Sequence, residues 1–410
     1  MQFLSLDQWL DSQHPVRVVW QYVDSLDLSE LYEPIKAVKG NVGRDAIDPR
    51  ILFGLWLFAT LEGITSARRL AELTTRDIPF MWICGGVSVN YHRLSDFRVA
   101  HGDLLERILI DSITVLIHND LITLETVGQD GMRVRASAGS GSFRRESSLE
   151  KAREKAQAYV DQLNEQDDDP SANELRREAA QKRVAREKLE RLEQAQAEME
   201  DMQEKYRKRS GEKRSEPRAS TTDPEARRMK MGDGGIRPAI NVQFASDGDA
   251  QMVIAVDVSS QGSDNGLMGP MIEKIKDDYG QTPGRHLVDG GFTHRDDITK
   301  AESAGTRIYA PLHQEKKQLE QGKDPYRGKP GDSPEMTAFR SRMGTDEAKE
   351  IYKRRSAIAE FPNADCRNRG LTQFRVRGLL KAKAQTLWHV LAFNFSRMLN
   401  LDYLKMVMES

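Results

Sequence analysis

The pattern of apolar and polar positions makes the first part of the chain helical. Residues 47–61 are apolar on almost every side, which predicts a buried helix. Leucine and isoleucine recur at helical spacing between Leu104 and Leu116, so we expect a longer helix there, capped by Ser95. Several short helices in succession predict a helical N-terminal domain over residues 1–122.

The middle of the chain alternates charged and small apolar residues over two helical runs. The first run covers 144–163 and the second covers 174–208, and the polar stretch 165–173 separates them. Two such runs joined by a short break are typical of an antiparallel helical pair. The pattern therefore predicts an inserted, charged helical hairpin over residues 143–218. The alternative interpretation of the same residues is a partly disordered spacer.

Strand and helix patterns alternate in the rest of the chain. Apolar runs bounded by turn residues predict strands at 126–134, 239–245, 252–258, 286–289 and 307–310. Helical spacing predicts helices at 265–279, 296–304, 346–360 and 381–408. Residues 311–345 are polar and rich in Gly, Pro and Lys, so we expect a long polar loop there.

The predicted fold class is therefore α/β, as a mixed α+β protein. The strand and helix patterns place its core in residues 123–142 and 219–400, on either side of the inserted hairpin, and 401–410 is the end of the last helix.

Composition narrows the class of protein. The 410 residues include only two cysteines, Cys84 and Cys366, which excludes a disulfide scaffold and the usual cysteine-based zinc site. No apolar run reaches the roughly 18–20 residues that span a bilayer, and the chain start has no basic signal region. No Gly-Lys-Ser/Thr phosphate loop supports a nucleotide-driven mechanism. We expect no membrane and no nucleotide partner, and a cytoplasmic, nucleoid-associated protein.

The charges are distributed unevenly. Residues 1–122 contain 16 acids and 11 Lys or Arg, whereas 351–410 contain 11 Lys or Arg and four acids. A polyanion would bind the basic end, unless that end is only a solvated surface. The acid excess of the first segment favours a bundle that packs or dimerises over a DNA-reading helix-turn-helix, although Arg98 and other arginines there are candidate contacts. In the basic end, the candidate DNA-binding residues are Arg375, Arg377, Lys381 and Lys383.

Three carboxylates suggest phosphodiester chemistry. Asp130 and Asp289 each follow an apolar stretch and stand next to glycine, which leaves room for a phosphate backbone to approach, and Glu360 lies on a basic helix. Two Mg²⁺ ions held by such a trio can clamp the attacking and leaving oxygens of a phosphodiester. Taken singly, an aspartate at a strand end is more often a turn former.

The chain resembles the DDE transposases of bacterial insertion sequences, in the branch with a helical insertion after the first catalytic strand. The phrases that carry the resemblance occur in family order: HPVRVVWQYVDSLDLSELY, YHRLSDFR, DGMRVRASAG, STTDPEARRMK, LVDGGF, YKRRSAIAE and RGLLKAKAQTLWHVLAFN. The resemblance implies an RNase H-like catalytic core, with Asp130, Asp289 and Glu360 as catalytic residues and metal ligands. It also implies two Mg²⁺ ions, which Mn²⁺ can replace, and no other cofactor.

The family's helix signature is matched in part. Tyr352 and Arg355 have the family interval, and Arg367 stands where the family has lysine, so all three are candidate DNA-binding residues. Arg355 is five residues before Glu360 instead of the usual four, and Pro362 should end or kink the helix near Phe361.

The expected function is that of an insertion-sequence transposase. It would cleave the phosphodiester bonds at element ends and join the 3′ ends to target DNA. Its partners would be double-stranded DNA, as terminal repeats and target, and further copies of itself in a homodimer or higher synaptic complex. The alternatives are a non-catalytic DNA-binding or scaffolding protein, and an RNase H-like nuclease without strand transfer.

Overall fold

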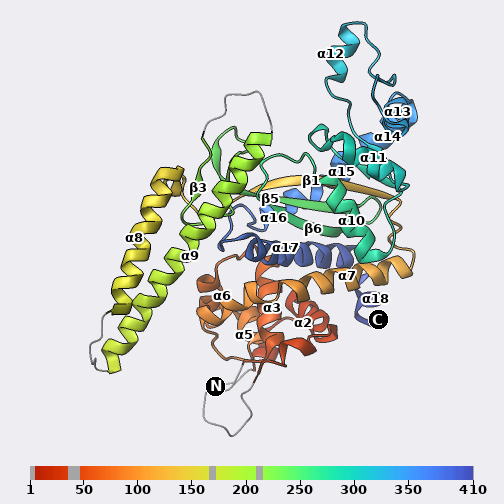
Figure 1. The fold of residues 1–410 in the computed structure, drawn as a ribbon. Coiled ribbons are helices and arrows are strands. Elements are labelled where there is room, and N and C mark those ends of the chain that lie inside the picture. Colours follow the sequence, from red (N-terminus) through yellow and green to blue (C-terminus); the bar gives the residue numbers. More distant parts are fainter. Residues whose placement is uncertain (1–4, 36–46, 166–171, 209–215, 410) are drawn as a thin grey trace.

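A computed structural model of the chain describes residues 5–35, 47–165, 172–208 and 216–409 (Figure 1). Seven α-helices form the N-terminal part: α1 (Leu6–Trp9), α2 (Pro15–Ser25), α3 (Pro49–Leu61), α4 (Ala67–Leu73), α5 (Ile78–Ile83), α6 (Tyr91–Ala100) and α7 (Gly102–His118). Helix α3 is buried on nearly all sides, as the sequence predicts, and the Asp48 side chain caps it through the backbone N–H of Arg50.

One prediction for this part is wrong. Ser95 lies inside α6 and caps nothing, because the Asn90 side chain caps α6 by accepting the backbone N–H of His92. Helix α7 starts only at Gly102, after the break at His101. The apolar residues between Leu104 and Leu116 are buried in α7, so the periodicity located the buried face of the helix correctly but not its start.

A six-stranded mixed sheet forms the centre of the molecule. Its strands are β1 (Thr126–Arg135), β4 (Arg227–Lys230), β5 (Ile236–Asp247), β6 (Val253–Ser259), β7 (Arg285–Leu287) and β8 (Arg307–Tyr309). The order is β4-β5-β1-β7-β8, and β6 also pairs with β5. Strand β1 is antiparallel to β5 and parallel to β7, which in turn is parallel to β8. The fold class is therefore mixed α+β, as predicted.

The helices of the second half are α10 (Met268–Tyr279), α11 (Arg295–Ser303), α12 (Glu315–Glu320), α13 (Pro334–Met343), α14 (Asp346–Lys353), α15 (Arg355–Ala359), α16 (Phe361–Asn368), α17 (Leu379–Asn400) and α18 (Leu404–Glu409). They lie around the sheet, except α12, which projects from the body, and α18, which contacts α2 and α7 (Figure 1). The stretch 311–345, expected to be only a loop, contains α12 and α13. Helix α13 buries Met336, Phe339 and Met343, whose i, i+3 and i+7 spacing puts them on one face among polar residues.

Two hydrophobic cores meet at the sheet. The larger one is continuous from the N-terminal helices through α17 to β1, β5 and β6, so the N-terminal helices share a core with the sheet. Helix α17 is the centre of this core, and its Asn394 side chain bonds both the N–H and the carbonyl of Val253 on β6. The smaller core lies between β7, β8, α11 and α13.

Helices α8 (Glu146–Glu165) and α9 (Ala172–Lys208) lie side by side and project from the body (Figure 1). They leave the sheet through the short strands β2 (Phe143–Arg144) and β3 (Ala219–Ser220), which pair with each other. Short 3₁₀ turns complete the fold at Ser29–Leu31, Ser140–Ser142 and Gly290–Phe292. In the described residues, no helix combines the length and apolar character needed to cross a bilayer.

Candidate active site

Asp130 lies in the middle of β1, and its side chain is 18% exposed. One carboxylate oxygen accepts a hydrogen bond from Nη2 of Arg355 at 3.0 Å. The other accepts from Nδ2 of Asn363 at 2.7 Å. Both oxygens are thus held by side chains from helices α15 and α16, far away in the sequence.

Glu360 is the residue that links α15 to α16. The chain breaks its helix there, and Pro362 falls in the first turn of α16, where its missing N–H costs no hydrogen bond. Nη1 of Arg355 donates to Oε1 of Glu360 at 3.1 Å, and the Glu360 side chain is 55% exposed. One guanidinium therefore bridges Asp130 and Glu360, despite the unusual spacing of Arg355 and Glu360.

A glycine on β1 allows this close packing. A Cβ atom at Gly128 would lie 2.8 Å from Cγ2 of Ile358 and 3.2 Å from Cβ of Ala359, which is closer than side chains normally approach. Because position 128 has no side chain, α15 rests directly on β1. This contact brings Arg355 within reach of Asp130.

Asp289 completes the group of acids. It follows β7, the parallel neighbour of β1, and its Oδ1 accepts the backbone N–H of Gly291 at 2.7 Å. Burial raises the pKa of Asp130 to about 6. The nearby guanidinium of Arg355 opposes this rise, and the charges of Asp289 and Glu360 add to it. Both Asp289 and Glu360 are therefore close enough for their charges to act on Asp130.

Tyr352 lies in the same region. Burial raises the pKa of its hydroxyl, the charge of Arg355 lowers it, and the charges of Asp289, Glu360 and Asp130 raise it again. The structure thus brings together five of the residues singled out from the sequence. We call Asp130, Asp289 and Glu360, with Arg355 between them, the carboxylate site.

The glycine beside Asp130 has a different role from the expected one. A Cβ atom at Gly131 would lie 2.4 Å from Oδ1 of Asp264 and 2.5 Å from Nε2 of Gln243. These two side chains occupy the space that the sequence analysis assigned to a phosphate. The Gln243 amide also donates to Oδ1 of Asp264 at 2.8 Å, so the glycine makes room for a polar contact inside the protein.

The remaining predicted DNA contacts lie elsewhere. Arg367 is exposed at the end of α16 and Lys381 is exposed in the first turn of α17. Lys383 is an internal ion-pair partner, with Nζ 2.8 Å from Oε2 of Glu106 on α7. Arg377 donates to the carbonyl oxygen of Ser137 at 3.4 Å.

The charge of one predicted DNA contact, Arg375, acts on another arginine, Arg98. The charge of Arg375 helps to lower the pKa of Arg98, after the larger effect of burial. Arg98 is only 5% exposed and donates to the carbonyl oxygen of Thr65, so the expectation that Arg98 is an exposed DNA contact is wrong.

Asn363 is a site residue that sequence reasoning missed. It is 4% exposed, its amide holds Asp130, and its Oδ1 is buried without a hydrogen-bond partner. The only signal in the sequence is its position three residues after Glu360, and the break of the helix at Glu360 makes that spacing uninformative.

The side chains at the carboxylate site fit a divalent cation by their chemistry. They offer carboxylate oxygens and the unpartnered amide oxygen of Asn363, which are ligands suited to Mg²⁺. A positive charge, the Arg355 guanidinium, already joins two of the acids. Among the described residues, no three acid, histidine or cysteine side chains converge closely enough to hold a metal ion.

Comparison with known families agrees with this chemistry. Residues 4–100 match the family described as a transposase domain (DUF772), and residues 332–399 match the family described as a transposase DDE domain. The two matches support a DDE transposase of an insertion sequence. Tyr352, Arg355 and Glu360 lie inside the second matched segment, whereas Asp130 and Asp289 lie outside both. Neither a curated protein nor a solved structure matches the chain.

Proposed function

We propose that this transposase cleaves phosphodiester bonds at the ends of an insertion sequence and joins the freed 3′ ends to target DNA by two-metal-ion transesterification. The observation that carries the proposal is the pairing of one guanidinium, that of Arg355, with both Asp130 and Glu360, while the charge of Asp289 also acts on Asp130. Acids gathered against their own charge, and held by a cation, are a feature of functional sites.

An RNase H-like core is part of this proposal. In support, β1 is central in the sheet. On one side β1 pairs antiparallel with β5, which pairs antiparallel with β6. On the other side β1 pairs parallel with β7, which pairs parallel with β8. The two aspartates come from the neighbouring strands β1 and β7, and the glutamate comes from the helices packed on β1. We propose domains at 1–122, at 123–142 with 219–400, and at 143–218.

Each residue of the carboxylate site has a proposed role. Asp130, Asp289 and Glu360 would hold the two Mg²⁺ ions, which when bound would activate the attacking water or 3′ hydroxyl and stabilise the leaving 3′ oxygen. Asn363 fixes the Asp130 carboxylate through one oxygen and leaves the other to Arg355. Arg355 neutralises Asp130 and Glu360 in the free protein, and once released from them it binds a DNA phosphate. Tyr352 lines the same region and orients the DNA.

Transposition needs two element ends in one complex, so we propose that the chain acts as a homodimer or a larger assembly on nucleoid DNA. The experiment incubates purified protein with duplexes carrying the element's own ends and a supercoiled target, and maps cut and joined strands. We expect 3′-end cleavage and joining with Mg²⁺ or Mn²⁺, and DNA binding without cleavage in Ca²⁺. Cleavage without joined products would instead make the chain a nuclease, and absence of cleavage with every metal would contradict the proposal.

A further inference from the structure

A second functional surface lies next to the carboxylate site. A cavity of about 390 Å³ borders the end of β1 and the end of α16. Four of its lining residues are arginines and one is an acid: Arg133, Arg135, Arg237, Arg367 and Asp233. We call this cavity the arginine pocket. Of its arginines, the sequence analysis singled out only Arg367.

Two elements connect the arginine pocket to the carboxylate site. Strand β1 carries Asp130 and, further along, Arg133 and Arg135. Side chains alternate between the two faces of a strand, so both arginines lie on the face of β1 opposite to Asp130. Helix α16 carries Asn363, which holds Asp130, and then Arg367 one turn later, about 6 Å along the helix axis. The arginine pocket therefore lies beside the carboxylate site without sharing its face of β1.

The pocket holds positive charge in a fixed place. The backbone of Arg135 is bonded on both sides, since its N–H donates to Thr372 and its carbonyl accepts from Phe374. Arg133 donates to the carbonyl of Gly262 at 3.0 Å, so its side chain has a defined position. The order of the backbone lowers the entropy that these arginines lose when they bind a ligand.

Two of the four arginines in the pocket are not paired with an acid among the described residues. Arg237 pairs with Asp233 at 2.7 Å, and Arg133 lies 3.5 Å from Asp264. Arg135 and Arg367 are exposed, and within the described parts of the chain neither pairs with an acid. Two unneutralised guanidinium groups that share one cavity repel each other, which favours the binding of an anion between them.

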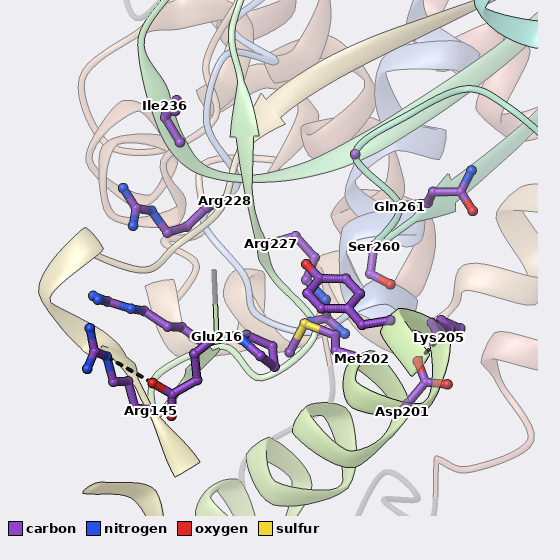
Figure 2. A pocket seen from close by; sticks show the side chains of 14 residues that line it. Arg145, Asp201, Met202, Lys205, Glu216, Arg227, Arg228, Ile236, Ser260 and Gln261 are labelled. Atoms are coloured by element: carbon purple, nitrogen blue, oxygen red, sulfur yellow. Dashed lines mark hydrogen bonds and ion pairs between the residues drawn. The ribbon is translucent and has the colours of Figure 1, made fainter. Parts of the chain in front are cut away.

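A larger basic cavity lies between the base of α9 and the edge of the sheet, and Figure 2 shows two of its cations joined to acids. Arg145 lies 3.2 Å from Glu216, and Lys205 lies 2.6 Å from Asp201. Two other arginines of that cavity, Arg218 and Arg228, are exposed and pair with no acid among the described residues. The arginine pocket also has two such arginines, and it differs in lying at the ends of the strand and the helix that carry Asp130 and Asn363.

We propose that the arginine pocket binds a phosphate of the DNA backbone that flanks the phosphodiester reacting at the carboxylate site. The chemistry is the bidentate pairing of guanidinium groups with phosphate oxygens. This inference rests on the proposed function for its position along the DNA. Phosphate binding itself is independent of cleavage.

The first test measures binding without any divalent metal. A fluorescein-labelled 30-base-pair duplex of mixed sequence is titrated with full-length protein at several KCl concentrations. For the double variant Arg135→Gln/Arg367→Gln, we expect the log–log salt slope to fall by about one unit, the effect of one lost phosphate contact. Arg135→Lys/Arg367→Lys keeps the charge and should retain most of the slope.

The matched control removes two exposed cations elsewhere, in Lys276→Gln on α10 and Lys405→Gln on α18. Its slope should stay within experimental error of the wild type. An unchanged slope in the arginine variant, or an equal fall in the control, would overturn the proposal. Thermal melting of each variant confirms that it is folded, and the single variant Arg237→Gln repeats the test from a different element.

The second test concerns position. On a duplex carrying the element's own end, single neutral methylphosphonates are placed in turn at the phosphates that flank the cut. One of them should weaken wild-type binding but not binding by the double arginine variant. Equal weakening of both proteins at every position would overturn the assigned contact. Failure of the proposed function would leave the salt-slope difference intact, whereas failure of the pocket would leave wild-type cleavage intact, so the two are distinguishable.

Discussion

The carboxylate site and the inserted pair α8–α9 are stabilised in different ways. At the carboxylate site, the charges of Asp289 and Glu360 oppose the ionisation of Asp130, and contacts with residues more than 200 positions away hold the Asp130 carboxylate. In the helical pair, two small apolar clusters and surface ion pairs hold neighbouring turns. The comparison indicates that the fold sacrifices stability at the carboxylate site for function, and not in the helical pair.

The largest effect on stability should come from Asp130. Its raised pKa, about 6, means that the metal-free folded protein binds a proton more tightly than the unfolded chain. The corresponding stability is fully present below about pH 3.9 and is lost as the pH rises through 6. Asp130→Asn should therefore stabilise the metal-free protein at pH 7.5 by on the order of 1–3 kcal/mol, with the gain vanishing near pH 4.

Thermal melting at both pH values measures this effect. Asp257→Asn, which removes an exposed acid from β6 of the same sheet, is the control and should change neither melting temperature. An Asp130→Asn protein that is no more stable than the wild type at pH 7.5 would show that the carboxylate site is not electrostatically unfavourable.

Shortening α8–α9 should have a smaller effect. Replacing residues 157–188 by a short flexible linker removes the outer cluster of Val160, Leu163 and Ala185 and keeps the cluster at the base of the pair. Because this outer cluster packs only within the pair, we expect the melting temperature to change by less than about 2 °C, with the β signal in circular dichroism retained.

A longer deletion, of 150–205, sharpens the same comparison. It also removes Leu192 and Met199, which pack near Ala219, and Glu198, which pairs with Arg227 at the edge of the sheet. It should cost more stability than the short deletion while leaving the sheet folded. Aggregation of the short deletion with loss of β structure would mean that the helical pair is part of the core.

Local patterns in the sequence predicted the elements well. The apolar runs at 126–134, 239–245 and 252–258 correspond to β1, β5 and β6, because a buried strand needs continuous apolar residues. The two helical runs of the middle segment correspond to α8 and α9. The charge pattern there reflects exposure on most sides of each helix.

The errors concern contacts between distant residues. Arg98 is buried on Trp56 and bonded to Thr65, and Lys383 pairs with Glu106 on another helix, so neither charge could be recognised as internal from its neighbours in the sequence. The role of Gly131 depends on Asp264, more than 130 residues away. The roles of Asn363 and of the arginine pocket likewise appear only when α16 packs beside β1.

The role of Glu360 is the central claim, since its spacing from Arg355 departs from the family pattern. The decisive measurement is single-turnover cleavage of element-end DNA with Mg²⁺ by Glu360→Gln, with DNA binding measured in Ca²⁺. Glu350→Gln on α14, also an exposed acid paired with a cation, is the control. The account predicts a loss of about 10³-fold in cleavage rate, the scale on which preorganised charges act, with binding unchanged and the control at wild-type rate. A Glu360→Gln protein that cleaves at nearly the wild-type rate would contradict the account and place the third carboxylate elsewhere.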